Sequence, residues 1–335
     1  MKVIIPVAGI GTRLRPHTHS TPKPLLHVAG RPILAHILEP IVKLSPDEVI
    51  FVVGFMGEQI VEWVKKHYTF RATFIQQDKL LGLGYALHLA MANIDNEPLL
   101  VVLGDTIADC DLGQFIKIGE NVLGLRQVDD PKRFGLAEIQ NGIVARLEEK
   151  PEHPKSNLAV IGLYYFKSAA PVKKSLSNLV ESGKTTRGEI QLTDALQDMI
   201  DGGTKFTPFE VKRWYDCGKK ETMLETNRYL LQSQAATAPS PNAYSGSLIK
   251  PPVYIAANAS IIDSILGPFT SVSAGTTIKN STVANSIVGE DVTIESMHII
   301  DSLVGHRSKL IGLMDRVSVF NIGEDTSIAC DKSRP

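Results

Sequence analysis

The sequence predicts an α/β domain built on a Rossmann-like, mostly parallel sheet with helices on both faces, followed by a parallel β-helix. In the first two thirds of the chain, short apolar runs alternate with segments of helical periodicity. Fully apolar strands that alternate with helices are typical of a parallel sheet covered on both faces. Nearer the C-terminus, one aliphatic residue recurs every five or six positions among small residues. This spacing favours the stacked coils of a β-helix over a run of irregular strands.

Apolar runs and periodic segments place the individual elements. Buried strands are predicted at 3–7, 49–53, 72–75, 99–103, 160–166 and 206–211. Helices are predicted at 33–44, 60–68, 86–94 and 219–232. Residues 234–242 have the Ala-, Ser- and Pro-rich composition of a linker. The repeat that follows runs through eleven aliphatic residues, namely Ile255, Ile261, Leu266, Val272, Ile278, Val283, Val288, Ile294, Ile299, Val304 and Leu310.

Length and charge argue against several classes of protein. The chain has 335 residues, 43% of them apolar, so it can bury a sizeable core and is not a disordered polymer. Its 35 Lys and Arg residues nearly balance its 36 Asp and Glu residues, which argues against a nucleic-acid partner. Cys110, Cys217 and Cys330 form no CxxC pair, and no stretch resembles a membrane span or a signal peptide. We therefore expect a cytoplasmic protein with no membrane partner.

A glycine-containing loop after the first strand is the first candidate site. The loop comprises Ala8, Gly9, Gly11 and Thr12. Glycines allow backbone N–H groups to close on a phosphate chain, Arg13 can bind phosphate oxygens through two N–H groups, and Lys23 can add a point charge. The spacing matches neither GxGxxG nor a Walker-type loop. Residues 1–38 hold five Lys or Arg residues and no Asp or Glu, which favours a polyanion site over a tight turn with solvated cations.

The pattern GxGTRL, followed by PKPLL at 22–26, resembles the signature of the sugar-phosphate nucleotidylyltransferases. It is most similar to the long-form glucose-1-phosphate thymidylyltransferases, although Ala8 stands where members commonly have a second glycine, as in some UDP-glucose pyrophosphorylases. The C-terminal repeat resembles the left-handed β-helix of hexapeptide-repeat proteins. The resemblance implies a nucleotidyltransferase catalytic domain at 1–230, a linker at 231–247 and a left-handed β-helix domain at 248–335.

Two further motifs resemble the nucleotide and metal sites of that family. By this resemblance, Gln77 would pair with the base and Gly82 would let the ring approach. Asp105, which ends an apolar strand, and Asp216, in the W-x-D-x-G pattern at 214–218, would bind Mg²⁺. Two carboxylates suffice when phosphate oxygens and water complete the coordination of Mg²⁺. The alternatives are an amide at a strand end, a helix-start glycine and two independent structural carboxylates.

The resemblance also implies a sugar-phosphate site. Its motifs are the [RY][FY]G-like element with Gly135, the EEKP element with Glu149 and Lys150, and the RGE-[IL]-x-[IL]-TD element at 187–194. In the family, Glu149 would accept two sugar hydroxyls and Lys150 would neutralise the sugar phosphate. The backbone of Val160 would lie near the sugar. Without the resemblance, the EEK triplet would be interpreted as a solvated surface.

The implied reaction is attack by the phosphate of a sugar 1-phosphate on the α-phosphorus of a nucleoside triphosphate, which gives an NDP-sugar and pyrophosphate. The expected substrates are glucose 1-phosphate and dTTP, with UTP as the alternative nucleotide. A phosphate monoester has a second pKa of roughly 6, so no general base is needed. Alignment and charge neutralisation are needed, and Arg13, Lys23 and Asp105 are the expected catalytic residues. His17, His19 and His27 are expected in packing or surface positions.

Three alternatives remain from the sequence. The protein could be a mannose-1-phosphate guanylyltransferase, or a non-catalytic regulatory subunit that binds a nucleotide sugar. The β-helix could transfer an acyl group with His298 or His306 as the base, although a structural role is favoured, in which it supports a homo-oligomer or packing between domains. Residues 320–327 are expected to close the last coil.

Overall fold

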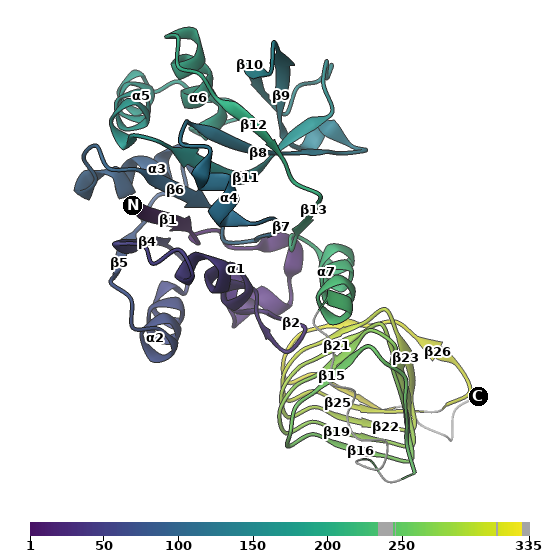
Figure 1. The fold of residues 1–335 in the computed structure, drawn as a ribbon. Coiled ribbons are helices and arrows are strands. Elements are labelled where there is room, and N and C mark those ends of the chain that lie inside the picture. The colour runs from purple at the N-terminus through teal and green to yellow at the C-terminus, as the bar shows by residue number, and fades with distance from the viewer. Residues whose placement is uncertain (234–243, 245, 313, 330–335) are drawn as a thin grey trace. The chain divides into compact units, whose positions relative to one another are not determined.

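The computed structural model describes residues 1–233, 244, 246–312 and 314–329 (Figure 1). By internal contacts the chain forms two compact units. The α/β unit comprises Met1–Ile10 and His36–Trp214, and the β-helix unit comprises Gly11–Ala35 and Tyr215–Pro335. The segment that carries Arg13 and Lys23 therefore packs with the C-terminal part of the chain. The functional division at 1–230, 231–247 and 248–335 stays a prediction, and most of its linker lies outside the described residues.

A nine-stranded mixed sheet forms the centre of the α/β unit. Its parallel part has the order β6-β1-β4-β5, and antiparallel β11 extends it beyond β6. The parallel strands are β1 (Lys2–Pro6), β4 (Glu48–Val53), β5 (Ala72–Gln76) and β6 (Leu99–Val102). The other strands are β8 (Val122–Gln127), β9 (Gly135–Gln140), β10 (Ile143–Glu149), β11 (Leu158–Phe166) and β12 (Thr207–Glu210). Every residue of β4 is buried, as expected for a parallel strand covered on both faces.

Helices cover this sheet, and α3, α5 and α6 pack against one another (Figure 1). The helices of the chain are α1 (Ile33–Val42), α2 (Gly57–His67), α3 (Leu83–Ala90), α4 (Leu112–Lys117), α5 (Ala169–Ser182), α6 (Leu192–Asp201) and α7 (Lys220–Ser233). The short strands are β2 (His27–Val28), β3 (Arg31–Pro32), β7 (Thr106–Asp109) and β13 (Arg213–Asp216). In the described ranges, no helix combines the length and apolarity needed to cross a membrane. The predicted α/β class is confirmed.

The C-terminal strands form three parallel sheets of five strands each, which stack as the coils of a β-helix (Figure 1). One sheet contains β14 (Leu248–Ile249), β17 (Ile265–Leu266), β20 (Thr282–Ala284), β23 (His298–Ile300) and β26 (Val317–Ser318). The second contains β15 (Val253–Ile255), β18 (Thr270–Val272), β21 (Ile287–Val288), β24 (Leu303–Val304) and β27 (Asn321–Ile322). The third contains β16 (Ser260–Ile262), β19 (Thr277–Lys279), β22 (Thr293–Glu295), β25 (Lys309–Ile311) and β28 (Ser327–Ala329). The left-handed β-helix predicted from the repeat is confirmed.

The periodic aliphatic residues line the interior of these coils. Ten of the eleven are buried in one core cluster, and Ile255 packs against that cluster at its edge. The residues expected to close the last coil instead contribute to it, because β27 pairs with β24 and β28 pairs with β25.

Small polar residues join successive coils. The Ser264 hydroxyl accepts a hydrogen bond from the backbone N–H of Ser281 at 3.1 Å, and the Ser281 hydroxyl accepts one from that of Met297 at 3.1 Å. Both serines are buried, so each hydroxyl satisfies a backbone donor that water cannot reach. This contact explains why small hydroxyl residues separate the aliphatic positions of the repeat.

A buried asparagine in α7 joins three parts of the β-helix unit. Asn227 Oδ1 accepts hydrogen bonds from the backbone N–H of Ala29 at 2.9 Å and from the Ser271 hydroxyl at 2.6 Å. Its Nδ2 donates to the carbonyl oxygen of Phe269 at 3.0 Å. Because Asn227 is fully buried, the loss of its side chain would leave these backbone groups without partners.

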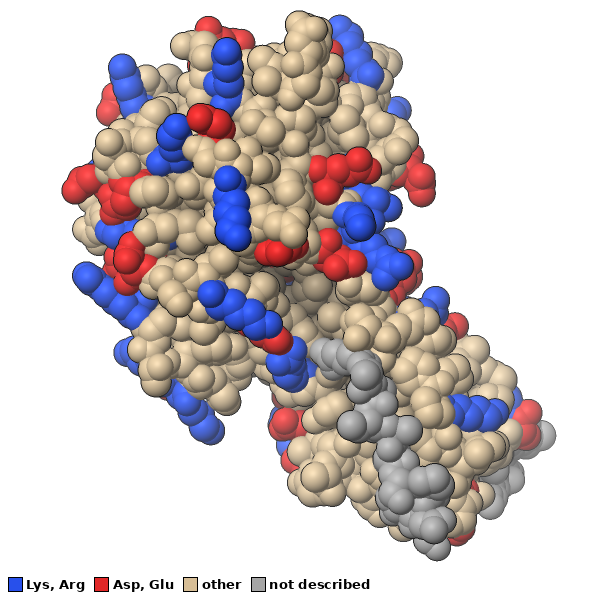
Figure 2. All heavy atoms as spheres, in the orientation of Figure 1, with Lys and Arg blue, Asp and Glu red and all other residues tan. Residues whose placement is uncertain are grey.

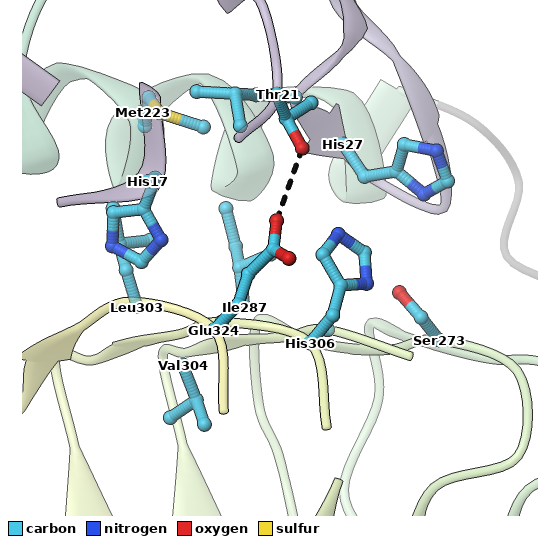
Figure 3. A pocket seen from close by; sticks show the side chains of 13 residues that line it. His17, Thr21, His27, Met223, Ser273, Ile287, Leu303, Val304, His306 and Glu324 are labelled. Atoms are coloured by element: carbon cyan, nitrogen blue, oxygen red, sulfur yellow. Dashed lines mark hydrogen bonds between the residues drawn. The ribbon is translucent and has the colours of Figure 1, made fainter. Parts of the chain in front are cut away.

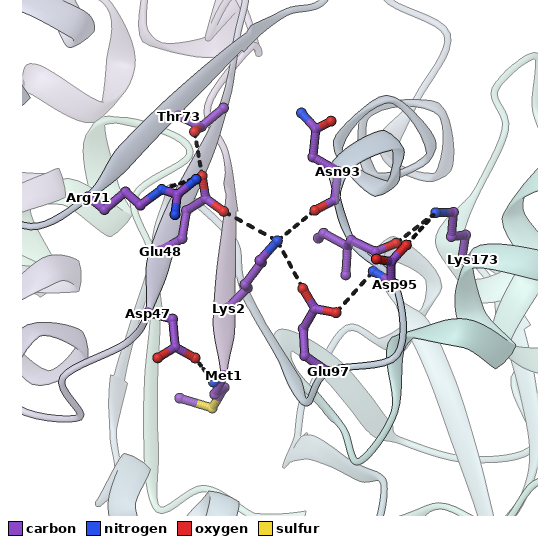
Figure 4. Close-up of polar contacts among 11 residues, drawn as sticks. Met1, Lys2, Asp47, Glu48, Arg71, Thr73, Asn93, Asp95, Glu97 and Lys173 are labelled. Carbon is purple, nitrogen blue, oxygen red and sulfur yellow. Dashed lines mark hydrogen bonds and ion pairs between the residues drawn. The ribbon is translucent and has the colours of Figure 1, made fainter.

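Charges of both signs are interspersed on the surface. Figure 2 shows Lys and Arg among Asp and Glu on the visible face of each unit. A group of such charges forms a network at the amino end of β1 (Figure 4). Lys2 Nζ lies 2.9 Å from Glu97 Oε1 and 3.4 Å from Glu48 Oε2, and it donates to the carbonyl oxygen of Asn93 at 2.6 Å. The hydrogen bond from Lys2 lowers the pKa of Glu97 to about 2.

Replacing Lys2 with Met should lower the free energy of unfolding near neutral pH by about 1–2 kcal/mol, since Glu97 is partly exposed and solvent screens the pair. A carboxylate with a depressed pKa stabilises the fold above its unfolded pKa, ordinarily 4.5 for Glu97, and loses that effect as pH falls toward about 2. The difference between wild type and Lys2→Met in urea unfolding should therefore shrink over this range. The exposed Lys43, as Lys43→Met, is the control, and a difference that stays constant with pH would contradict the account.

Candidate functional site

The predicted site residues of the glycine loop are divided between the two units along the sequence: Ala8 and Gly9 belong to the α/β unit, and Gly11 and Thr12 belong to the β-helix unit. In the α/β unit, the backbone N–H of Val7 donates to the carbonyl oxygen of Val52 at 2.8 Å, which continues the contact of β1 with β4. Ala8 is buried, and Gly54 makes room for it, because a Cβ at Gly54 would lie 2.7 Å from the Ala8 carbonyl oxygen. A Cβ at Gly9 would meet nothing within 4 Å. The loop therefore presents an open backbone at Gly9.

The second half of the loop belongs to the β-helix unit. Gly11 has a φ of 70°, in the left-handed region that favours glycine, and its carbonyl oxygen accepts a hydrogen bond from the Thr18 hydroxyl at 3.0 Å. A 3-10 helix, Thr12–Leu14, starts there. Leu14 is buried and anchors this turn, whereas Thr12 and Arg13 are exposed. The turn thus leaves the Arg13 side chain available to an anion.

Arg13, Lys23 and Asp216 lie together, and we name them the cationic cluster. Lys23 Nζ is 4.0 Å from Asp216 Oδ1. A Cβ at Gly218 would lie 2.6 Å from Asp216 Oδ1 and 2.9 Å from Arg13 Nη2, so both side chains flank this glycine. Two cations beside one carboxylate leave a net positive charge, which favours an anionic ligand.

Asp105 follows β6 in the α/β unit. Gly104, just before it, donates to the carbonyl oxygen of Pro6 at 3.2 Å, and a Cβ at Gly104 would lie 2.4 Å from Val7 Cγ1. Glycine at 104 therefore lets the turn that carries Asp105 approach the end of β1. Burial raises the pKa of the Tyr164 phenol, and the carboxylates of Glu149 and Asp105 add to the rise.

Gln77 and Gly82 lie in the connection between β5 and α3. The Gln77 side chain is buried, and its Nε2 donates to the carbonyl oxygen of Lys79 at 3.1 Å. Gly82 has a φ of 105°, and a Cβ there would lie 2.7 Å from the carbonyl oxygen of Ile190. The same oxygen accepts a hydrogen bond from the N–H of Gly84 at 2.8 Å. The connection is thus held against the RGE-type motif.

The expected sugar-phosphate residues meet in the α/β unit, and we name Gly135, Glu149, Lys150 and Thr193 the carboxylate cluster. Glu149 Oε2 accepts a hydrogen bond from the Thr193 hydroxyl at 2.7 Å, and Glu149 Oε1 is 3.3 Å from Lys150 Nζ. A Cβ at Gly135 would lie 2.8 Å from Glu149 Oε2. Arg187 Nη2 donates to the carbonyl oxygen of Lys150 at 2.8 Å. The motifs EEKP and RGE-[IL]-x-[IL]-TD are therefore in direct contact.

Three neighbouring residues were not singled out from the sequence. Thr193 and Trp214 each lie inside a motif recognised from the sequence, but nothing else in the sequence indicated a role for either residue. Tyr164 follows a bulge in β11 after Val160, whose partner in β8 is Leu125. Trp214 packs edge-on against Phe134 at 5.2 Å between ring centroids, and its buried Nε1 has no hydrogen-bond partner in the ranges that the structure describes. Such contacts between distant segments leave no local pattern.

The family model described as nucleotidyl transferase matches residues 2–233. The chain belongs to the nucleotidyl transferase family. Glucose-1-phosphate thymidylyltransferase from Streptomyces antibioticus is 32% identical over 332 residues, which cover 91% of this chain and 92% of that relative. The bifunctional protein GlmU from Methanocaldococcus jannaschii is 37% identical over 238 residues, which cover 69% of this chain but only about half, 54%, of that relative.

Two solved structures resemble this nucleotidyl transferase. A protein from Bacillus anthracis described as a glucose-1-phosphate thymidylyltransferase, in complex with sucrose, has 30% identity and a TM-score of 0.61 over 68% of this chain and 94% of that one. A UDP-glucose pyrophosphorylase complexed with UDP-glucose has 24% identity and a TM-score of 0.59 over 70% of this chain and 99% of that one, which supports the fold alone.

The carboxylates expected to bind a metal have suitable donor chemistry. Asp105 and Asp216 offer only oxygen donors, and oxygen is the donor that Mg²⁺ prefers. Within the described ranges, no group of three or more His, Cys, Asp or Glu side chains could by itself hold a metal ion. A magnesium ion in this nucleotidyl transferase would therefore have to take further ligands from substrate phosphates and water.

Gly82→Ala should lower the free energy of unfolding by about 3 kcal/mol or more, because it combines backbone strain with a clash against Ile190. Gly183 is a matched control, since it also has a positive φ, of 65°, but a Cβ there would meet nothing within 4 Å. Gly183→Ala should cost only about 1–2 kcal/mol. Urea unfolding of both variants measures the difference, and equal losses would show that the approach of Ile190 imposes no constraint.

Proposed function

We propose that the protein transfers a nucleotidyl group from a nucleoside triphosphate to a sugar 1-phosphate, with dTTP and glucose 1-phosphate as the preferred pair. The observation that carries the proposal is the full set of family motifs on a nucleotidyl transferase fold, together with a thymidylyltransferase relative that matches 91% of the chain. UTP is the alternative nucleotide, because Ala8 occupies a position where some UDP-glucose pyrophosphorylases also lack a second glycine. The proposed setting is the cytoplasm, and the proposed assembly is a homo-oligomer.

The triphosphate is assigned to the glycine loop and the cationic cluster. The open backbone at Gly9 and the positive φ of Gly11 suit close approach by phosphate oxygens. Arg13 can donate two parallel hydrogen bonds, and Lys23 adds a second charge.

The base is assigned to Gln77 and Gly82. Gln77 is buried just after β5, as an amide that reads a base should be.

The sugar 1-phosphate is assigned to the carboxylate cluster, with the backbone of Val160 beside it. Glu149 is held by Thr193 and can still accept sugar hydroxyls, since each carboxylate oxygen has two lone pairs. Lys150 has a φ of 44°, and this turn follows Glu149 directly. Adjacent placement lets one residue bind the sugar ring while the next neutralises its phosphate.

The reaction needs alignment and charge neutralisation rather than a base. The attacking phosphate is already ionised near neutral pH, since its second pKa is roughly 6. Lys150 reduces the charge on the attacking phosphate, and Arg13 and Lys23 reduce the charge on the triphosphate, so the two anions can approach in line. Asp105 and Asp216 would hold Mg²⁺, which when bound supplies further positive charge at the phosphates.

The direct test is pyrophosphate release from a matrix of dTTP, UTP, GTP, CTP and ATP with several sugar 1-phosphates, with and without Mg²⁺. The proposal expects release only when a triphosphate, a sugar 1-phosphate and Mg²⁺ are all present, with dTTP and glucose 1-phosphate the best pair. A preference for GTP and mannose 1-phosphate would favour a guanylyltransferase instead. Tight binding of a nucleotide sugar without turnover in any combination would favour a regulatory subunit.

Gly135→Ala should raise the KM for the sugar 1-phosphate about ten- to a hundredfold, because the new Cβ displaces the Glu149 carboxylate and a hydrogen bond to a charged group is worth about 1.5–3 kcal/mol. The KM for the nucleotide should change little. Gly142, in the turn of the same hairpin, faces open space, so Gly142→Ala is the control. Steady-state kinetics separates the two constants, and an equal rise in both would argue against a sugar-phosphate role for this cluster.

A further inference from the structure

The segment between Arg13 and Lys23 is bound by a carboxylate from the last coil of the β-helix. Ser20 and Thr21 both donate their hydroxyl hydrogens to Glu324 Oε1. Figure 3 shows the bond from Thr21, which is 3.2 Å long. Thr21 lies two residues before Lys23, separated from it only by Pro22. All of these residues belong to the β-helix unit. Glu324 therefore holds the phosphate-binding segment two residues before Lys23.

Glu324 is itself held in place. Its Oε2 accepts a hydrogen bond from Arg307 Nη2 at 2.6 Å, and Arg307 Nε also donates to Asp325 Oδ1 at 2.8 Å. The Glu324 side chain is only 16% exposed. Burial opposes its ionisation, but hydrogen bonds from Ser20 and Arg307 outweigh burial and lower the pKa of Glu324. The carboxylate is therefore charged near neutral pH, with both oxygens in use.

A small pocket surrounds this contact within the β-helix unit (Figure 3). His17, His27 and His306 line it, and its volume of about 40 Å³ admits only a few water molecules. Burial lowers the pKa values of His17 and His27, so neither is a cation that would compete for Glu324 near neutral pH. The hydrogen bond from Thr21 to the carboxylate is partly buried, which strengthens it.

Two further contacts keep the same segment on the same coil. His17 Nε2 lies 2.9 Å from Asn321 Oδ1, at the start of β27. Pro16 packs on Gly323, where an added Cβ would lie 3.1 Å from Pro16 Cβ. Pro16, His17, Ser20 and Thr21 thus all contact residues 321–324 of the last coil.

We propose that Glu324 is a positioning residue for nucleotidyl transfer, which fixes Ser20 and Thr21 and thereby places Lys23 for the triphosphate. The β-helix then contributes indirectly to substrate binding, as the support of the phosphate-binding segment. The inference rests on the proposed assignment of Lys23 to the triphosphate.

The test compares Glu324→Ala, Glu324→Gln, Thr21→Val and Asp325→Ala in steady-state kinetics with dTTP and glucose 1-phosphate. Loss of a hydrogen bond to a charged group predicts a rise of about tenfold in the KM for dTTP for Glu324→Ala, with the KM for glucose 1-phosphate unchanged. Glu324→Gln should recover part of the loss, because its amide oxygen still accepts from both hydroxyls, whereas its NH2 group cannot accept the hydrogen bond from Arg307. Thr21→Val should also raise the KM for dTTP, because it removes the hydroxyl that donates to Glu324. Asp325→Ala is the comparison variant, because it removes a neighbouring carboxylate that bonds to Arg307, and the KM for dTTP should rise less than in Glu324→Ala, since both hydroxyls keep their bonds to Glu324.

The same proteins separate this proposal from the proposed function. If wild type releases no pyrophosphate with any substrate pair, the proposed function fails, and calorimetric titration with Mg²⁺-dTTP and Mg²⁺-UTP tests the positioning role alone. Weaker nucleotide binding in Glu324→Ala with recovery in Glu324→Gln supports it. An unchanged KM and affinity in Glu324→Ala, an equal rise in both KM values, or no recovery by Gln overturns it. If Glu324→Ala does not fold, Thr21→Val decides by the same criteria.

Discussion

The structure depends on one constraint, which is that Gly11–Ala35 is fixed by groups from the C-terminal part of the chain. The central group is Asn227, whose buried amide satisfies the N–H of Ala29 and the carbonyl of Phe269 at once. A buried amide that makes several hydrogen bonds is strongly directional, since any shift leaves a polar group unsatisfied. Gly11–Ala35 is therefore held on α7 and the coils, although the residues before and after it belong to the α/β unit.

Because of this constraint, the cationic cluster and the carboxylate cluster belong to different units. The cationic cluster lies in the β-helix unit, where Arg13 and Lys23 outnumber Asp216. The carboxylate cluster lies in the α/β unit, where Glu149 is oriented by Thr193 and accompanied by Lys150. The proposed reaction between two phosphate anions would use both kinds of group, because binding would have to neutralise charge on each substrate while a carboxylate recognises the sugar. The repeat thus belongs to the same unit as the cationic cluster.

Most of the fold could be predicted from local patterns. The buried strands β1, β4 and β6 were predicted within one residue of their observed ends, because fully apolar runs bounded by polar residues have few other interpretations. The ends of β5 were predicted equally well, but its residues are only partly buried, so the predicted burial of this strand was wrong. The repeat was equally clear, since each buried aliphatic residue must stack on the next. The hairpin of β9 and β10 gave no such signal, because Arg146 and Glu148 face solvent between buried positions and the pattern has a bulge.

The site could be predicted as a set of residues but not as an arrangement. Motif order indicated Glu149 and Lys150, yet the bond from Thr193 to Glu149 joins residues 44 positions apart. The contact of Thr21 with Glu324 spans 303 positions. Sequence periodicity describes only neighbours along an element, so the assignment of Gly11–Ala35 to the β-helix unit required tertiary contacts. The packing of His17 and His27 also could not be located from the sequence, because both residues pack near distant residues of the last coils, such as His306 and Glu324.

Hydrogen–deuterium exchange of Asn227→Ala, compared with wild type, tests most directly whether Gly11–Ala35 is held by the C-terminal part of the chain. The account predicts faster exchange in peptides covering 25–30 and in peptides covering 269–272. The N–H of Ala29 loses its acceptor, and the Phe269 carbonyl and the Ser271 hydroxyl lose their hydrogen bonds to Asn227. Peptides covering β6 should keep their wild-type rates. Faster exchange at 269–272 with unchanged exchange at 25–30 would contradict the account, because Gly11–Ala35 would then be held independently of Asn227 and the C-terminal part of the chain.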